Sequence, residues 1–138
     1  MTFVADTSAF VAVLFREADA DRYRTALIEA QRVLLSAATT LELHLVIATR
    51  SGAAGVLLLN ELLDQPQFEI VAADAQQLRL ARNAFDRYGK GRHPAALNFG
   101  DLFSYALAKS TDLPLLYKGQ DFAQTDVTPA LEPEPARG

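Results

Sequence analysis

The fold is organised around residues 97–108, LNFGDLFSYALA, which place an acidic residue at the start of an apolar helix. Gly100 permits a bend in the chain, and Asn98 or Asp101 can cap the first helical turn. The following residues, 102–108, are too apolar to lie on a wet surface. Asp101 is therefore expected at the mouth of a buried helix. A cap alone would explain such an Asp, so a further role depends on acids elsewhere in the chain.

The composition is that of one soluble domain. A chain of 138 residues, half of them apolar, can bury a core. The absence of Cys and the presence of only two His exclude disulfides, thiolate zinc sites and a histidine-rich metal centre, so any metal ion must be held by oxygen. No leader pattern and no charge-free run of about twenty apolar residues is present, which indicates a cytoplasmic protein without a membrane segment. The net charge of -4 argues against a protein that coats nucleic acid non-specifically, but a local basic patch is compatible with it.

Short apolar runs alternate with helical patterns along the chain. Strands are expected at 2–5, 33–36, 68–71 and 115–117, with an edge strand near Val127, and helices at 9–15, 18–31, 37–50, 53–64, 74–88 and from 101 onward. The helix at 37–50 is apolar around nearly its whole circumference, so we expect it to be buried. This alternation predicts an α/β domain with a mainly parallel sheet over residues 1–130. The proline-rich tail at 131–138 is expected to be flexible.

Four carboxylates occupy positions in this predicted fold from which they could form one site. Asp6 and Asp121 each follow a strand end, and Asp101 opens a helix that can point its start toward the same edge of the sheet. Glu42 lies within the apolar helix, where a carboxylate is costly unless it is paired, binds a cation or reaches solvent from a helix end. If the four acids share a pocket, a divalent cation must offset their repulsion, and carboxylate oxygens suit Mg²⁺ or Mn²⁺. Phosphodiester hydrolysis by an activated water is then the natural reaction.

Four blocks of the sequence carry a resemblance to a known family. They are VADTSA at residues 4–9, residues 36–42, the block NFGD at 98–101 with its helix, and LLYKGQDF at 115–122. In this order they resemble the PIN-domain ribonucleases, and specifically the VapC toxins of bacterial toxin-antitoxin pairs. The resemblance spans the whole domain and implies a three-layer α/β/α sandwich with a parallel central sheet.

The resemblance also implies an activity and a set of site residues. A Mg²⁺-dependent endoribonuclease is expected, with Mn²⁺ as a substitute, and the acidic catalytic and metal site would consist of Asp6, Glu42, Asp101 and Asp121. Supporting roles fall to Thr7, Ser8 and Asn98. Gly119 and Gln120 stand where some relatives carry an additional acid, which puts occupancy by two metal ions in question. The family further implies a homodimer and an antitoxin whose carboxyl-terminal segment covers the site.

One segment of the chain is densely basic. It runs from residue 79 to residue 93 and leads directly into the Asp101 helix. Because an acidic protein must concentrate its phosphate contacts, we expect this segment to hold RNA through four residues, Arg87, Lys90, Arg92 and His93. A merely solvated helix face is the alternative.

Two helices carry apolar residues beyond a single core stripe. Val56 and Leu57 extend the apolar surface of the helix at 53–64, and the helix at 18–31 offers Tyr23 and Leu27. If these helices lie side by side, as the resemblance suggests, the four side chains would line a groove for an amphipathic antitoxin helix. Packing in the core or in the homodimer interface is the alternative.

Other functional classes fit parts of the pattern. A receiver-like signalling domain also has strand-end acids and a late lysine, here Lys118, but it pairs two acids at the first strand end, where Thr7 and Ser8 follow Asp6. A phosphatase of the haloacid-dehalogenase type would require an Asp at position 8. A catalytically silent PIN fold acting as an interaction module is a third alternative, against which the four intact acids argue.

Overall fold

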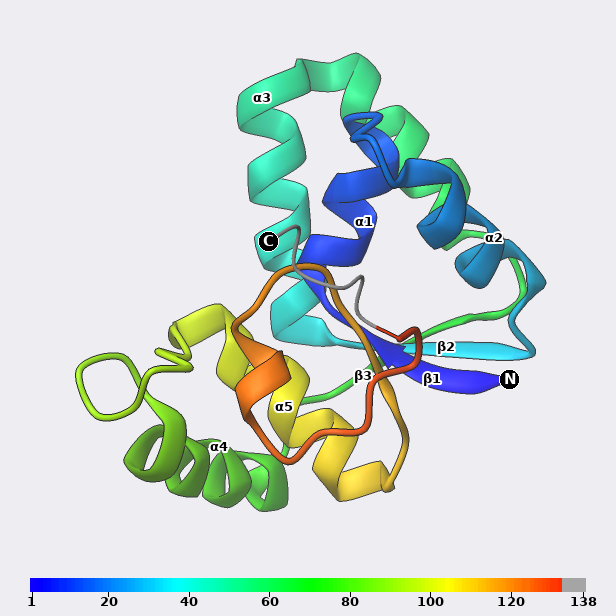
Figure 1. Cartoon of the computed structure of the whole chain (residues 1–138). Helices are drawn as coiled ribbons and strands as arrows, with labels where there is room; N and C mark the ends of the chain where they lie inside the picture. Colours follow the sequence, from blue (N-terminus) through cyan, green and yellow to red (C-terminus); the bar gives the residue numbers. More distant parts are fainter. Residues whose placement is uncertain (133–138) are drawn as a thin grey trace.

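A four-stranded sheet forms the centre of the computed structural model, which describes residues 1–132 (Figure 1). Its strands are β1 (Thr2–Ala5), β2 (Arg32–Ser36), β3 (Phe68–Val71) and β4 (Leu115–Leu116). They lie in the order β3-β2-β1-β4, and every pair is parallel. Because parallel neighbours share one direction, all four carboxyl ends lie along the same edge of the sheet.

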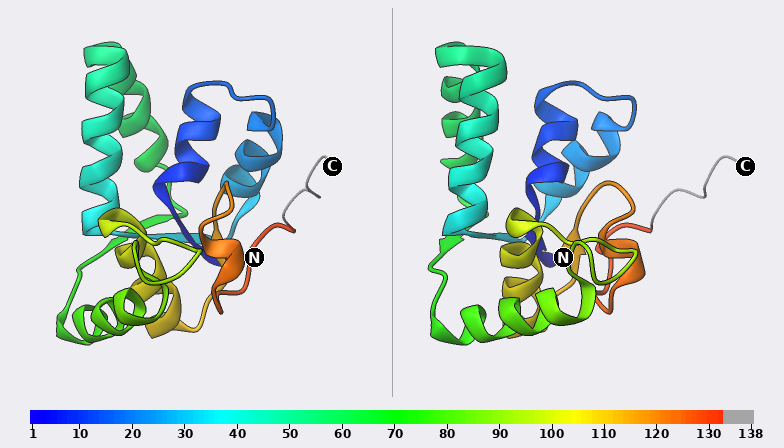
Figure 2. Two further views of the ribbon diagram at one scale, coloured as in Figure 1. Left: turned by 60° about the vertical axis from the view of Figure 1, so that its left-hand side comes forward. Right: turned by 90° about the vertical axis from the view of Figure 1, so that its left-hand side faces the viewer.

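Five helices connect the strands and cover the sheet. They are α1 (Thr7–Leu14), α2 (Ala20–Glu29), α3 (Ala37–Leu63), α4 (Ala75–Tyr88) and α5 (Phe99–Thr111), and a short 3-10 helix, η1 (Phe122–Gln124), follows β4. Helices α1, α2 and α3 lie on one face of the sheet, and α4 and α5 lie on the other (Figures 1 and 2). This arrangement confirms the predicted three-layer α/β/α sandwich.

Each face of the sheet has its own hydrophobic core. Successive residues of a strand point to opposite faces, so Phe3 packs toward α1 and α3 while Val4 packs toward α5. In β2, Leu35 and Leu34 divide between the two cores in the same way. Burial on both faces explains why β1 and most of β2 are continuous runs of apolar residues, whereas the edge strand β3 carries the exposed Glu69 and Ile70.

Helix α3 is broken in the middle. Gly52, with φ 63°, interrupts the helix, and its two halves fold back beside each other, as the Ser51-Gly52 pair predicts (Figure 1). The prediction that its first half is buried all round is wrong, because Leu41 and Leu45 are exposed. Only one face of this half meets the rest of the domain. As a whole, α3 is long and apolar enough to cross a membrane, but the break and the buried Leu43 and Leu59 make it a pair of helices packed onto the domain core.

The end of the described chain lies against the domain. In place of the edge strand expected near Val127, one bridge joins Leu115 to Pro129. Leu131 packs against the first core, and Arg22 donates a hydrogen bond to the carbonyl of Glu132. The rest of the predicted tail, residues 133–138, lies outside the described residues.

Candidate active site

Asp6 is a buried acid at the junction of β1 and α1. Its side chain is 4% exposed and caps α1 by accepting the Ser8 N–H at 3.1 Å. The Ser8 hydroxyl donates to the same carboxylate oxygen at 2.7 Å, and Ser104 Oγ, from α5, donates to the other oxygen at 2.6 Å. Three donors therefore satisfy a carboxylate that is almost entirely removed from water.

Glu42 reaches the same region from α3. Its Oε1 accepts a hydrogen bond from Thr7 Oγ1 at 2.6 Å, and its carboxylate lies against Gly100 of α5. A Cβ at position 100 would overlap this carboxylate, so the Glu42 side chain can occupy this position only because residue 100 is glycine. Glu42 is half-buried and Asp6 is more buried, which corrects the expectation that Glu42 is the least surface-like acid.

Asp101 opens α5 in a capping box. Its N–H donates to Asn98 Oδ1 and its Oδ2 accepts the Asn98 N–H, both at 3.0 Å. Burial raises the pKa of Asp101 to about 7; the hydrogen bond from Asn98 lowers this pKa, and the charges of Asp6, Asp121 and Glu42 raise it. The structure thus brings the four acids expected from the sequence into one electrostatic neighbourhood.

The loop after β4 carries Asp121 and is tied to α1. Asp121 itself is exposed. The Lys118 N–H donates to Ser8 Oγ at 3.0 Å, and Lys118 Nζ pairs with Glu17 at 2.7 Å and with Asp19 at 2.9 Å. Because its ammonium group is bound by these two acids, Lys118 does not serve Asp6 as the lysine of a receiver domain would.

The donor set suits an oxygen-seeking cation. Within residues 1–132, no group of three or more His, Asp or Glu side chains is arranged tightly enough to form a ready metal site. Like charges keep carboxylates apart, and a divalent cation removes that repulsion. Four carboxylates without histidine or thiolate fit Mg²⁺ or Mn²⁺ far better than zinc.

Comparison with known proteins places the chain in a family. The model of the PIN-domain family matches residues 3–127 of this chain. Ribonuclease VapC30 of Mycobacterium tuberculosis is 47% identical over 131 residues, which cover 94% of this chain and 99% of the relative. The chain belongs to the VapC ribonucleases of the PIN-domain family. Ribonuclease VapC of Mycolicibacterium smegmatis is 48% identical over 124 residues, covering 90% of this chain and 96% of that protein. The family and enzyme class predicted from the sequence are thereby confirmed.

Solved VapC structures share the fold. Mycobacterium tuberculosis VapC20, described as a toxin that cleaves the sarcin-ricin loop, has a TM-score of 0.77 at 14% identity and covers 94% of this chain and 99% of its own. VapBC2 from Rickettsia felis, bound to a promoter DNA fragment, has a TM-score of 0.70 at 14% identity, with 94% and 96% covered. At such identities the likeness shows the fold alone.

The basic residues lie in and beside the segment that joins α4 to α5. The four expected to hold RNA are Arg87, Lys90, Arg92 and His93. Arg87 is engaged in an ion pair with Asp126 at 3.7 Å, and His93 Nδ1 accepts the Ala95 N–H at 3.0 Å. Lys90 and Arg92 are exposed. This segment leads directly into Asn98 at the capped start of α5.

Two of the residues expected to bind the antitoxin are buried. Tyr23 is 5% exposed and donates its hydroxyl to the Tyr117 carbonyl at 3.0 Å, and Leu27 is 1% exposed. The prediction that they line a groove is wrong, because α2 turns its apolar stripe into the core. Val56 is half-buried against that core, whereas Leu57 is 59% exposed on the second half of α3.

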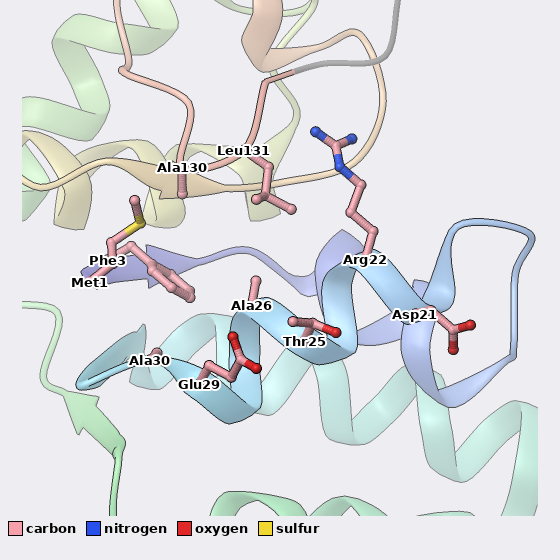
Figure 3. A pocket seen from close by; sticks show the side chains of 10 residues that line it. All are labelled: Met1, Phe3, Asp21, Arg22, Thr25, Ala26, Glu29, Ala30, Ala130 and Leu131. Atoms are coloured by element: carbon pink, nitrogen blue, oxygen red, sulfur yellow. The ribbon is translucent and has the colours of Figure 1, made fainter.

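A cavity of about 590 Å³ lies beside α2 (Figure 3). Its floor is apolar, with Phe3, Ala26 and Leu131, and Arg22 and Glu29 lie on its rim. None of the four acids lines this cavity, so it is separate from the candidate active site.

Sequence reasoning missed two hydroxyl residues that belong to the site. Ser104 and Thr39 are 0% and 1% exposed, and their oxygens lie 3.3 Å apart. The available signal was the isolated hydroxyl of Ser104 in an otherwise apolar run three residues after Asp101. A buried hydroxyl needs a partner, but the sequence does not indicate that Asp6 supplies it.

Proposed function

We propose that the chain is a divalent-cation-dependent endoribonuclease toxin that acts in the cytoplasm and is neutralised by a cognate antitoxin. The observation that carries this proposal is the shared electrostatic environment of Asp6, Glu42, Asp101 and Asp121 in a chain of the VapC family. Repulsion among these carboxylates is unfavourable in the isolated fold, and a divalent cation bound between them would offset it.

The four carboxylates would hold Mg²⁺, or Mn²⁺ in its place. When bound, the ion supplies an activated water and neutralises charge on the scissile phosphate. Thr7 and Ser8 orient Glu42 and Asp6 through hydrogen bonds of 2.6 Å and 2.7 Å. Burial raises the pKa of Asp101 to about 7 in the cation-free chain, so cation binding there competes with protonation and weakens as the pH falls.

RNA would enter along the segment between α4 and α5. Lys90 and Arg92 are exposed there and provide positive charge for the phosphates of the substrate. Arg87 and His93 assist from positions that are partly engaged within the protein. Concentrating cations beside an acidic site offsets the repulsion that a protein of net charge -4 exerts on RNA.

Two exposed apolar areas fit the expected protein partners. Leu57 and Leu58 on the second half of α3 would receive an amphipathic antitoxin helix. Leu78, Phe85 and Phe99 border a cavity of about 350 Å³ between α4 and α5, and a second copy of the chain would cover them in a homodimer. Solved neighbours from Rickettsia felis and Salmonella typhimurium are toxin-antitoxin complexes, which supports an antitoxin partner.

The decisive experiment incubates purified, antitoxin-free protein with tRNA, rRNA and mRNA in Mg²⁺ or in EDTA. Cleavage is expected only with the divalent cation, and Asp101→Asn should abolish it while the variant still unfolds cooperatively. Cleavage that persists in EDTA, or in a doubly substituted Asp6→Asn and Asp101→Asn protein, would show that the acids are not the reaction centre.

A further inference from the structure

A chain of buried hydroxyls ends on Asp6. Ser104 Oγ donates to Asp6 Oδ1 at 2.6 Å and lies 3.3 Å from Thr39 Oγ1. A serine hydroxyl carries one proton, and Ser104 gives it to the carboxylate, so Thr39 is the donor in the second hydrogen bond. The chain therefore runs from Thr39 of α3 through Ser104 of α5 to Asp6 after β1, and it joins three separate elements.

The two oxygens of Asp6 are held from different parts of the protein. Oδ2 is bound by Ser8, which is a neighbour in sequence. Within residues 1–132, Ser104 provides the one hydrogen bond to Oδ1. Without it the carboxylate would be anchored at a single oxygen and free to turn about its terminal bond. With it the plane of the carboxylate is fixed. Oδ2 already accepts two hydrogen bonds from Ser8, whereas Oδ1 accepts one from Ser104 and keeps a lone pair for a cation.

We propose that Ser104, itself held by Thr39, is a positioning residue that orients Asp6 toward the divalent cation. This inference rests on the proposed function, since it requires Asp6 to be a metal ligand. Partners of metal ligands commonly change metal affinity by about 10- to 100-fold. A role confined to satisfying buried polar groups would instead lower stability and leave the affinity for the metal unchanged.

The test measures Mn²⁺ binding to the whole chain without RNA, by electron paramagnetic resonance titration and by the rise in melting temperature that Mn²⁺ causes. Ser104→Ala should weaken Mn²⁺ binding about tenfold and shrink the rise in melting temperature. Ser110→Ala is the matched control. Ser110 lies on the same helix, but its hydroxyl donates to the Leu107 carbonyl at 3.1 Å, so this variant should bind Mn²⁺ as the wild type does.

Further variants separate the inference from the proposed function. If Asp6→Asn loses Mn²⁺ binding and Ser104→Ala keeps wild-type affinity, the positioning role is overturned and the metal site stands. If the wild type does not bind Mn²⁺, or if Asp6→Asn binds Mn²⁺ as tightly as the wild type, the proposed metal site is refuted. The positioning role of Ser104 is then refuted as well, because it requires that site. If Ser104→Ala does not fold, Thr39→Val decides: weaker Mn²⁺ binding supports the hydroxyl chain, and unchanged affinity overturns it.

Discussion

Replacing Asp101 by Asn should stabilise the cation-free protein near neutral pH and have little effect in acid. The amide oxygen of Asn can still accept the Asn98 N–H that Asp101 Oδ2 accepts at 3.0 Å. What the substitution removes is the cost of an ionised carboxyl that is partly buried beside three other acids. A variant that deletes a proposed metal ligand is thus expected to be more stable than the wild type.

The magnitude follows from the pKa of Asp101, which rises from 3.8 to about 7 on folding. Folding therefore favours the protonated form, so this group adds stability below about pH 4 and loses it as the pH rises toward 7. The full shift would correspond to about 4 kcal/mol at 1.36 kcal/mol per pKa unit. Because Asp101 is not completely buried, solvent screening reduces this value, and we expect a gain of about 1 to 2 kcal/mol.

The assay is urea unfolding of both proteins in EDTA at intervals from pH 4 to pH 8. The difference in unfolding free energy should be near zero at pH 4 and grow toward pH 7. Asp86→Asn, which removes an exposed acid on α4, should show no such growth. Parallel stability curves for the wild type and Asp101→Asn would refute the account of crowded carboxylates.

Three further outcomes test other parts of the site. Neutralising Arg87 and Arg92 together should flatten the slope of log RNA affinity against log salt concentration. The slope should change by roughly 0.7 for each RNA phosphate that the variant no longer neutralises. An unchanged slope would show that both residues face solvent and do not contact RNA. Gly100→Ala places its new Cβ on the Glu42 carboxylate, so this side chain must move and the variant should bind Mn²⁺ more weakly. Because the displaced atoms are the end of a flexible side chain, urea unfolding should change little. Wild-type Mn²⁺ affinity would contradict the close approach of Glu42 to Gly100. Leu57→Glu should reduce antitoxin affinity in a pull-down titration while RNA cleavage and dimer mass stay unchanged, and normal antitoxin binding would move the docking surface elsewhere.

Local signals allowed much of the fold to be predicted. Asp6, Asp74 and Asn98 each cap a helix where an acid or amide precedes a helical pattern, and Gly52 breaks α3 where a Ser-Gly pair interrupts it. Such signals are contained within a few residues. The alternation of strands and helices then fixes a parallel sheet, and with it the edge where Asp6 and the loop of Asp121 meet.

Burial and long-range contacts could not be predicted in the same way. Periodicity shows that Leu27 and Leu41 belong to apolar stripes, but it does not show which stripe another element covers. Leu27 is buried by α1 and the sheet, whereas Leu41 is left exposed. Likewise, Ser104 contacts Asp6, which lies 98 residues earlier in the chain. No local sequence pattern indicates a contact between residues so far apart.

The pairing of β1 with β4 has a consequence during synthesis. β1 begins at Thr2, and its partner on one side is not made until residues 115–116. Asp6 precedes Asp101, Ser104 and Asp121 by 95 or more residues. A chain that folds while it is translated therefore keeps these carboxylates apart until β4 has been made. The order of the strands thus ties assembly of the acidic centre to synthesis of the last strand of the sheet.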